Sequence, residues 1–191
     1  MEQKIDHNEA LGLFYDFAHL DDDQIERLGE IGYPDAPASK GHHLACPGGL
    51  ERHSVNVTKR LVALTQALGV AWSRPESPYL VGMLHDLVKC KCYRFNDDGK
   101  GYRYVQPDWP GHGAASVMIA TFDLGIQLNA DEAAAITWHM GAFGLQGRAL
   151  DEFDAALGKW PTQIIATHTA DWAAARIDEQ GDWKEERTVQ P

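Results

Sequence analysis

The sequence GMLHDLVK, residues 82–89, places an adjacent His85 and Asp86 inside an apolar helical segment, with Lys89 one helical turn later. Three polar or charged side chains so close together are unusual in a helix that lines a protein core. Burying a carboxylate is costly unless a cation or hydrogen-bond donors compensate its charge. We therefore expect Asp86 to face a compensating group, and a bound metal ion is one that would serve.

Around this segment, the hydrophobic periodicity predicts an all-α fold with one small β-hairpin inserted between helices. Residues 33–49 are rich in Pro and Gly and are expected to form a loop. The aromatic arms YRF and YRYV flank the turn residues NDDGKG within 92–105 and predict the hairpin. The tail 181–191 is expected to be frayed. The helices are expected over residues 7–20, 50–69, 77–90, 112–125, 129–141, 149–160 and 161–180, with a short acidic helix or turn over 21–32.

The predicted helix ends carry signals of their own. Gly69 is placed as a C-cap, and Ser77 is placed as an N-cap with Pro78 at the first helical position. Asn129 and Glu132 have the spacing of a capping box.

Length and charge exclude several classes of protein. The 191 residues suffice for one domain, and no internal repeat or linker divides them. A net charge of -11 argues against binding long nucleic acid, which requires a basic surface. No apolar run approaches the roughly 20 residues that cross a membrane, and the polar start MEQKIDHNEA does not have the pattern of a signal peptide. With an odd count of three cysteines, the expected location is the reducing cytoplasm.

Candidate metal ligands are spread over successive predicted helices. Metal sites in helical bundles are built in this way, from side chains on facing helices. Imidazole and carboxylate together suit first-row metals such as Mn, Fe, Co, Ni and Zn. The spacing therefore predicts one metal centre whose ligands are His53, His85, Asp86, His112, His139 and Asp171.

These residues carry a resemblance to a known family. His53, the doublet of His85 and Asp86, and Asp171 match the H…HD…D signature of the HD-domain metal-dependent phosphohydrolases. GGLERHSVNV resembles the first motif helix of that family, GMLHDLVK the doublet helix and TADWAAA the last motif. The resemblance covers roughly residues 45–178. It implies a single HD domain over residues 1–191, a helical bundle with an N-terminal extension over about 1–44 and a core over about 45–180.

The resemblance also implies a function. His112 and His139 are similar to the extra histidines of members that hold two metal ions, so two divalent transition metals are expected, with Asp86 bridging them. The implied activity is hydrolysis of a nucleotide or another phosphoester by a metal-activated hydroxide, with Asp86 and Lys89 as catalytic residues. Two alternatives stay open, an HD-fold di-iron oxygenase and a non-catalytic ligand-sensing module. The oligomeric state is not predicted.

Further side chains have two interpretations each. His42 and His43 either line the mouth of the site or belong to the preceding loop. His168 either orients Asp171 or has a plain polar role. Cys90 and Cys92 either form half of a zinc site or are core or hairpin residues.

The segment 89–103 carries five cations against Asp97 and Asp98. It is either a phosphate-binding patch or the solvated face of a hairpin. Trp109, Trp138 and Trp172 are expected to pack against other side chains.

Overall fold

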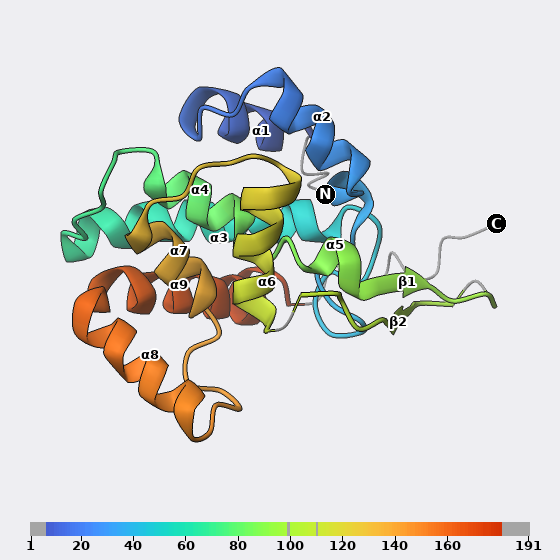
Figure 1. Ribbon diagram of the computed structural model, residues 1–191. Helices are drawn as coiled ribbons and strands as arrows, with labels where there is room; N and C mark the ends of the chain where they lie inside the picture. Colours follow the sequence, from blue (N-terminus) through green and yellow to red (C-terminus); the bar gives the residue numbers. More distant parts are fainter. Residues whose placement is uncertain (1–6, 99, 110, 181–191) are drawn as a thin grey trace.

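The computed structural model describes residues 7–98, 100–109 and 111–180 and is mostly helical, with one two-stranded antiparallel hairpin (Figure 1). The tail 181–191, predicted to be frayed, lies outside the described residues. The elements are α1 (His7–Gly12), α2 (Asp22–Glu30), α3 (Gly49–Leu68), α4 (Ser77–Leu84), α5 (Lys89–Cys92), β1 (Tyr93–Phe95), β2 (Tyr102–Tyr104), α6 (His112–Met118), α7 (Ala130–Thr137), α8 (Arg148–Lys159) and α9 (Pro161–Ala173). Shorter turns of 3-10 or π geometry cover Leu13–Phe17, Tyr33–Asp35, Ile119–Asp123 and Ala174–Asp178, the last of which we call η4.

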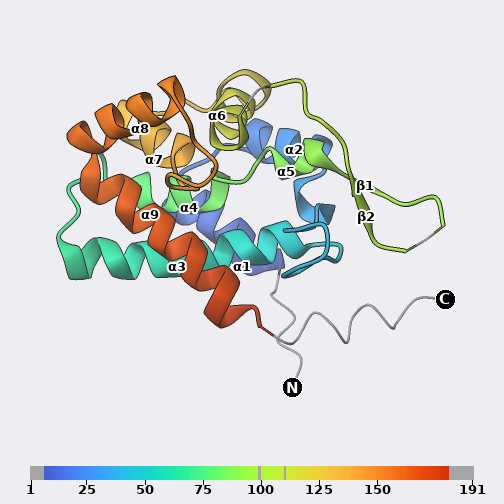
Figure 2. The same ribbon diagram turned by 90° about the horizontal axis from the view of Figure 1, so that it is seen from below.

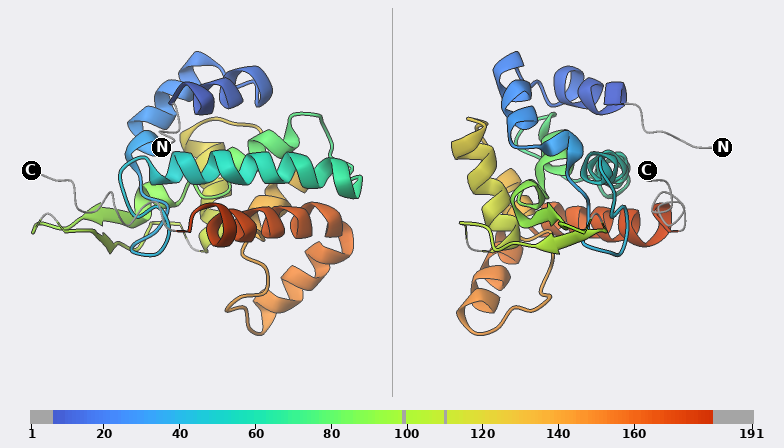
Figure 3. Two further views of the ribbon diagram at one scale, coloured as in Figure 1. Left: turned by 180° about the vertical axis from the view of Figure 1, so that it is seen from behind. Right: turned by 90° about the vertical axis from the view of Figure 1, so that its right-hand side faces the viewer.

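The helices pack around one main core, and the hairpin projects away from it. Helices α3 and α9 lie side by side. The N-terminal helices α1 and α2 lie against α3 and α4 on the side away from α9 (Figures 2 and 3). Strands β1 and β2 extend from one end of the molecule in Figures 1 and 2 and in the left-hand view of Figure 3. None of the described helices combines the length and the apolar character needed to span a membrane.

Two glycines allow helices that carry candidate ligands to approach closely. A Cβ on Gly82 of α4 would collide with Thr58 of α3, and a Cβ on Gly113 of α6 would collide with the main-chain carbonyls of Ile136 and Thr137 in α7. Any larger residue at either position would therefore push two helices apart. These two contacts set the distances between the segments that carry the histidines.

The predicted helix over 77–90 is wrong at its C-terminal end, because α4 stops at Leu84. The amide of Val88 donates to the hydroxyl of Ser116 over 3.1 Å, so it does not continue the helical ladder. The amide of Lys89 donates to the Asp86 carbonyl over 2.9 Å, an i to i+3 bond typical of a tighter turn. His85 and Asp86 therefore stand on a tight turn that follows α4.

The predicted helix over 129–141 also ends early, at Thr137. The ring Nδ1–H of His139 donates to the carbonyl of Ile136 over 2.7 Å and occupies one of the acceptors left over at a helix end. His139 thus lies two residues beyond α7. The predicted C-cap at Gly69 is confirmed, with a left-handed φ of 62°.

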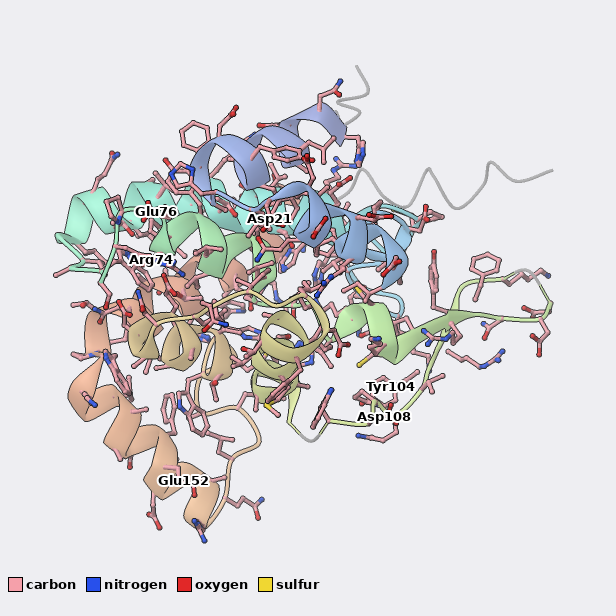
Figure 4. The ribbon with its side chains drawn as sticks, turned by 45° about the horizontal axis from the view of Figure 1, so that its top comes forward. Asp21, Arg74, Glu76, Tyr104, Asp108 and Glu152 are labelled. Atoms are coloured by element: carbon pink, nitrogen blue, oxygen red, sulfur yellow. The ribbon has the colours of Figure 1, made fainter. Side chains whose placement is uncertain are left out.

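The capping box of Asn129 and Glu132 is confirmed, whereas Ser77 has a different role from the one predicted. Ser77 is the first residue of α4, and its hydroxyl donates to the buried Glu132 carboxylate over 2.7 Å. Arg74, in the loop between α3 and α4, adds a two-pronged pair to the same carboxylate at 2.7 and 2.9 Å. This cluster lies at the end of the molecule opposite Tyr104 of the hairpin (Figure 4).

Candidate metal centre

All six side chains predicted as ligands converge on one buried centre. His53 comes from α3, Asp171 from α9 and His112 from the first residue of α6. His85 and Asp86 follow α4, and His139 follows α7. Their ligand atoms form overlapping groups in which all atoms lie within 4.8 Å of one another, namely His53–His85–Asp86, His85–His139–Asp171 and Asp86–His112–His139.

The carboxylate of Asp86 stands between two pairs of histidines. Its Oδ2 lies 3.2 Å from Nε2 of His85 and 3.4 Å from Nε2 of His53. Its Oδ1 lies 2.6 Å from Nε2 of His112 and 3.5 Å from Nε2 of His139. One oxygen therefore faces each pair, which is the arrangement that a carboxylate shared by two ions would require.

Asp171 completes the first of these two sides. Its Oδ1 lies 3.1 Å from Nε2 of His53 and 3.9 Å from Nε2 of His85. Burial alone would raise the pKa of Asp171, but the close contact and charge of His53 and the charges of the other histidines lower it. The carboxylate is thus held ionised, the form that binds a metal.

The three fully buried histidines each turn one nitrogen inward. The other ring nitrogen, Nδ1, points away from the centre and has a partner in each case. Nδ1 of His85 donates to the Gly82 carbonyl over 2.9 Å, and Nδ1 of His139 donates to the Ile136 carbonyl. Nδ1 of His53 faces the Glu179 carboxylate at 3.0 Å. On the inner side, none of the three Nε2 atoms has a hydrogen-bond partner among the described residues. An outer partner that fixes the tautomer and leaves Nε2 free is typical of histidines that bind metals. This donor set fits a first-row transition metal.

Lys89 lies against the centre and supplies a cation that compensates the buried carboxylate of Asp86. Its Nζ is 2.5 Å from Oδ2 of Asp86, although the lysine is itself buried. Burial would raise the pKa of Asp86, but the charge of Lys89, aided by the histidines, holds it well below its usual value. Burial would likewise lower the pKa of Lys89, but the charges of Asp86 and Asp171 raise it. Without an ion, Lys89 is the main compensating charge.

Glu179 is a site residue that the sequence reasoning missed. It lies just beyond η4, is 3% exposed and contacts His53 from the outer side. Only a general rule could have suggested it, since a histidine that binds a metal needs a partner for its second nitrogen. The neighbouring Asp178 satisfies that rule equally well in the sequence but pairs with Arg60 instead.

A pocket of about 710 Å³ opens onto the centre and is lined by residues of three kinds. Three of them, Asp86, His112 and Asp171, belong to the predicted ligand set. The other residues are the polar or charged Ser39, His42, His43, Lys89, Arg176 and Gln180, and the aromatic or apolar Ala38, Gly41, Tyr93, Met140, Trp172 and Ala175. His42 and His43 therefore both line the pocket, in agreement with the interpretation that places them at the site.

Among the described hairpin residues, Tyr93 lines this pocket and the basic side chains do not. Arg103 lies near Asp97 at 3.4 Å, and Arg94 donates to main-chain carbonyls of its own segment. Of the cations in the segment 89–103, Lys89 therefore lies at the pocket, Lys91 pairs with Asp123 in the main body, and Arg94 and Arg103 are on the exposed hairpin.

The remaining candidates have roles outside the ligand set. Nδ1 of His168 donates to the His139 carbonyl over 2.7 Å, so the structure pairs it with the turn after α7 and gives no bond to Asp171. Burial raises the pKa of the Cys90 thiol to about 12 and disfavours the thiolate that zinc requires. Trp138 packs against Phe153, as expected.

The packing expected for Trp172 is confirmed on one face of its ring only. Its side chain is 63% exposed and borders the pocket beside Asp171. Its ring stacks on His168 with a centroid distance of 6.4 Å. Trp109, by contrast, stacks on Phe122 as expected.

Searches of protein-family models, curated proteins and solved structures found no match to this chain.

Proposed function

We propose that this chain is a metal-dependent phosphohydrolase of the HD-domain family, acting on a nucleotide or a similar small phosphoester. The observation that carries the proposal is the set of three buried, unpartnered Nε2 atoms of His53, His85 and His139 around Asp86. A buried imidazole nitrogen that forms no hydrogen bond is costly unless a group binds it, and each of these three faces, among the described residues, only the carboxylate of Asp86 or Asp171. A metal ion fits their chemistry and their tautomers.

The same geometry supports two ions. His53, His85, Asp86 and Asp171 would hold the first, and His112 and His139 would hold the second with the other oxygen of Asp86. When bound, such ions lower the pKa of a water molecule and polarise phosphoryl oxygens. Protons now held among these residues would be released, because metal ligands bind in their deprotonated forms.

The pocket supports a phosphorylated substrate with a flat aromatic part. Lys89 and Arg176 supply positive charge beside the centre, and no ion pair of Arg176 is found among the described residues. Trp172 and Met140 supply an exposed apolar wall. Stacking of one nucleobase on an aromatic side chain contributes about 1–3 kcal/mol. A nucleotide would use both features, with its phosphate beside the centre and Lys89 and its base against Trp172.

The test combines metal reconstitution with a substrate screen. The purified protein is stripped with a chelator, reloaded with Mn, Fe, Co, Ni or Zn, and assayed on bis-p-nitrophenyl phosphate and on nucleotides. We expect turnover with at least one metal, and Asp86→Asn should lose both the metal and the turnover. Asp123→Asn, which removes the surface partner of Lys91, is the matched control and should keep both.

Three outcomes would overturn the proposal. Wild-type protein that binds none of these metals would remove the centre. Metal binding without hydrolysis of any phosphoester would favour a ligand-sensing module. Turnover that requires oxygen, compared in aerobic and anaerobic assays, would favour the di-iron oxygenase.

A further inference from the structure

Glu179 makes an unusual set of contacts for a carboxylate near the end of the described chain. Its Oε1 and Oε2 lie 3.0 and 3.2 Å from Nδ1 of His53, and Nδ2 of Asn56 donates to Oε1 over 3.1 Å. Nε2 of His43 lies 3.8 Å from Oε2. A carboxylate that is 3% exposed requires such donors, and here His53 is the nearest one.

The outer partner of His53 differs in charge from those of the other two buried histidines. His85 and His139 each donate Nδ1–H to a main-chain carbonyl three residues earlier in their own turn. His53 alone donates to a carboxylate, which comes from 126 residues further along the chain. A negative partner on Nδ1–H increases the electron density at Nε2 and makes the imidazole a stronger metal ligand than a neutral partner does.

The position of Glu179 is held by contacts along one face of α3. Three residues of α3, spaced by about one helical turn each, make these contacts: His53, Asn56 and Arg60. They contact Asp178 or Glu179, at the end of η4 and just after it. Arg60 forms a two-pronged pair with Asp178 at 2.5 Å for both bonds. The turn η4 has π geometry, and the amide of Glu179 closes it by donating to the Ala174 carbonyl.

We propose that Glu179 is a positioning residue that strengthens His53 as a ligand and so selectively raises the affinity of the ion held by His53, His85, Asp86 and Asp171. The inference rests on the proposed metal centre. The second ion, at Asp86, His112 and His139, has no ligand in contact with Glu179 among the described contacts. Its affinity should therefore depend little on residue 179.

The test measures metal affinity directly and does not depend on turnover. Stripped protein is titrated with Co²⁺ alone, with the visible absorption of the bound ion and a competing chelator as readouts. Glu179→Gln keeps the shape and an acceptor oxygen but removes the charge, and Glu179→Ala removes both. Loss of such an outer partner lowers metal affinity by about 10–100-fold. We expect that loss for one ion in Glu179→Ala and a smaller loss in Glu179→Gln.

The neighbouring Asp178→Asn is the matched control, because it breaks the pair with Arg60 in the same turn but leaves the contact with His53. It should keep both affinities within about threefold, a band well below the 10–100-fold effect expected at Glu179. Equal losses in Asp178→Asn and Glu179→Gln would reduce Glu179 to a structural role, and wild-type affinity in Glu179→Gln and Glu179→Ala would overturn the inference. If Glu179→Ala does not fold, Glu179→Gln decides alone. Wild-type protein that binds no Co²⁺ would instead refute the metal centre itself.

Discussion

The ammonium group of Lys89 lies 2.5 Å from Oδ2 of Asp86, the same oxygen that faces His53 and His85. An ion bound between these ligands would compete with Lys89 for that oxygen. Lys89 also lines the pocket, so it can contact a phosphoryl group there. Under the proposed function, the lysine would therefore pair with the carboxylate in the metal-free protein and with the substrate in the loaded one.

Replacing this lysine should separate catalysis from metal binding. Lys89→Met keeps most of the side-chain volume and removes the charge. We expect turnover to fall by on the order of 10²–10³, the usual loss for one electrostatic contact to a reacting group. The metal content should stay at the wild-type level, because a competing cation is removed. Elemental analysis and steady-state kinetics check the two parts.

Lys91→Met is the matched control, since Lys91 pairs with Asp123 on the surface. It should leave both quantities unchanged. A Lys89→Met enzyme with the wild-type rate would limit Lys89 to neutralising Asp86.

The double variant His112→Ala/His139→Ala should distinguish one metal from two. The two histidines face Oδ1 of Asp86, away from His53 and His85. We expect about one ion per chain in the variant against two in the wild type, with most of the activity lost. The variant His7→Ala/His19→Ala removes two exposed histidines and should keep two ions. A single ion in fully active wild-type protein would contradict the two-metal arrangement.

The metal-free protein should lose stability in mild acid, partly through His43. Burial, followed by the charges of His53 and Lys89, lowers the pKa of His43 from 6.5 to about 4. The unfolded chain therefore binds more protons between these pH values, so the contribution of His43 is complete above pH 6.5 and is lost as the pH falls toward 4. It amounts to roughly 3 kcal/mol in the free energy of unfolding.

Denaturant unfolding at pH 7 and at pH 4 checks this prediction. His43→Phe keeps a ring but does not titrate, so its stability should fall by roughly 3 kcal/mol less than that of the wild type over the same interval. His19→Asn changes an exposed histidine at a left-handed position that Asn tolerates, and it should follow the wild type. An equal loss of unfolding free energy between pH 7 and pH 4 in His43→Phe and in the wild type would refute the prediction.

Gly82→Ala should test whether the contact between α3 and α4 sets the site. The added methyl would collide with Thr58, and overpacking of this kind costs about 1–3 kcal/mol. His85 follows only three residues later, so metal affinity should fall as well. Gly158→Ala in α8 meets nothing within 4 Å and should instead stabilise by about 0.5–1 kcal/mol. Thermal unfolding and metal titration measure both effects, and an unchanged affinity in Gly82→Ala would show that the doublet adjusts freely.

The helical fold and the group of side chains at its centre were predictable because they depend on local patterns. Apolar periodicity and capping residues such as Gly69 and Asn129 are read along the chain, and they located most helices to within a few residues. When several helices each carry one candidate ligand, few arrangements of the helices can bring all of these ligands to one centre. Helices that bury one common face bring His53, His85 and Asp171 together.

The sequence by itself therefore determined which side chains meet, because their types and their spacing already require a shared polar centre in an apolar core. The tertiary structure alone decided how each of them is held. Helix α4 stops at Leu84, and in the turn that follows Ser116, from another helix, accepts the Val88 amide; His53 acquires its outer partner from Glu179, 126 residues away. Such contacts depend on which atoms the fold brings within about 3 Å, and no local pattern records that distance.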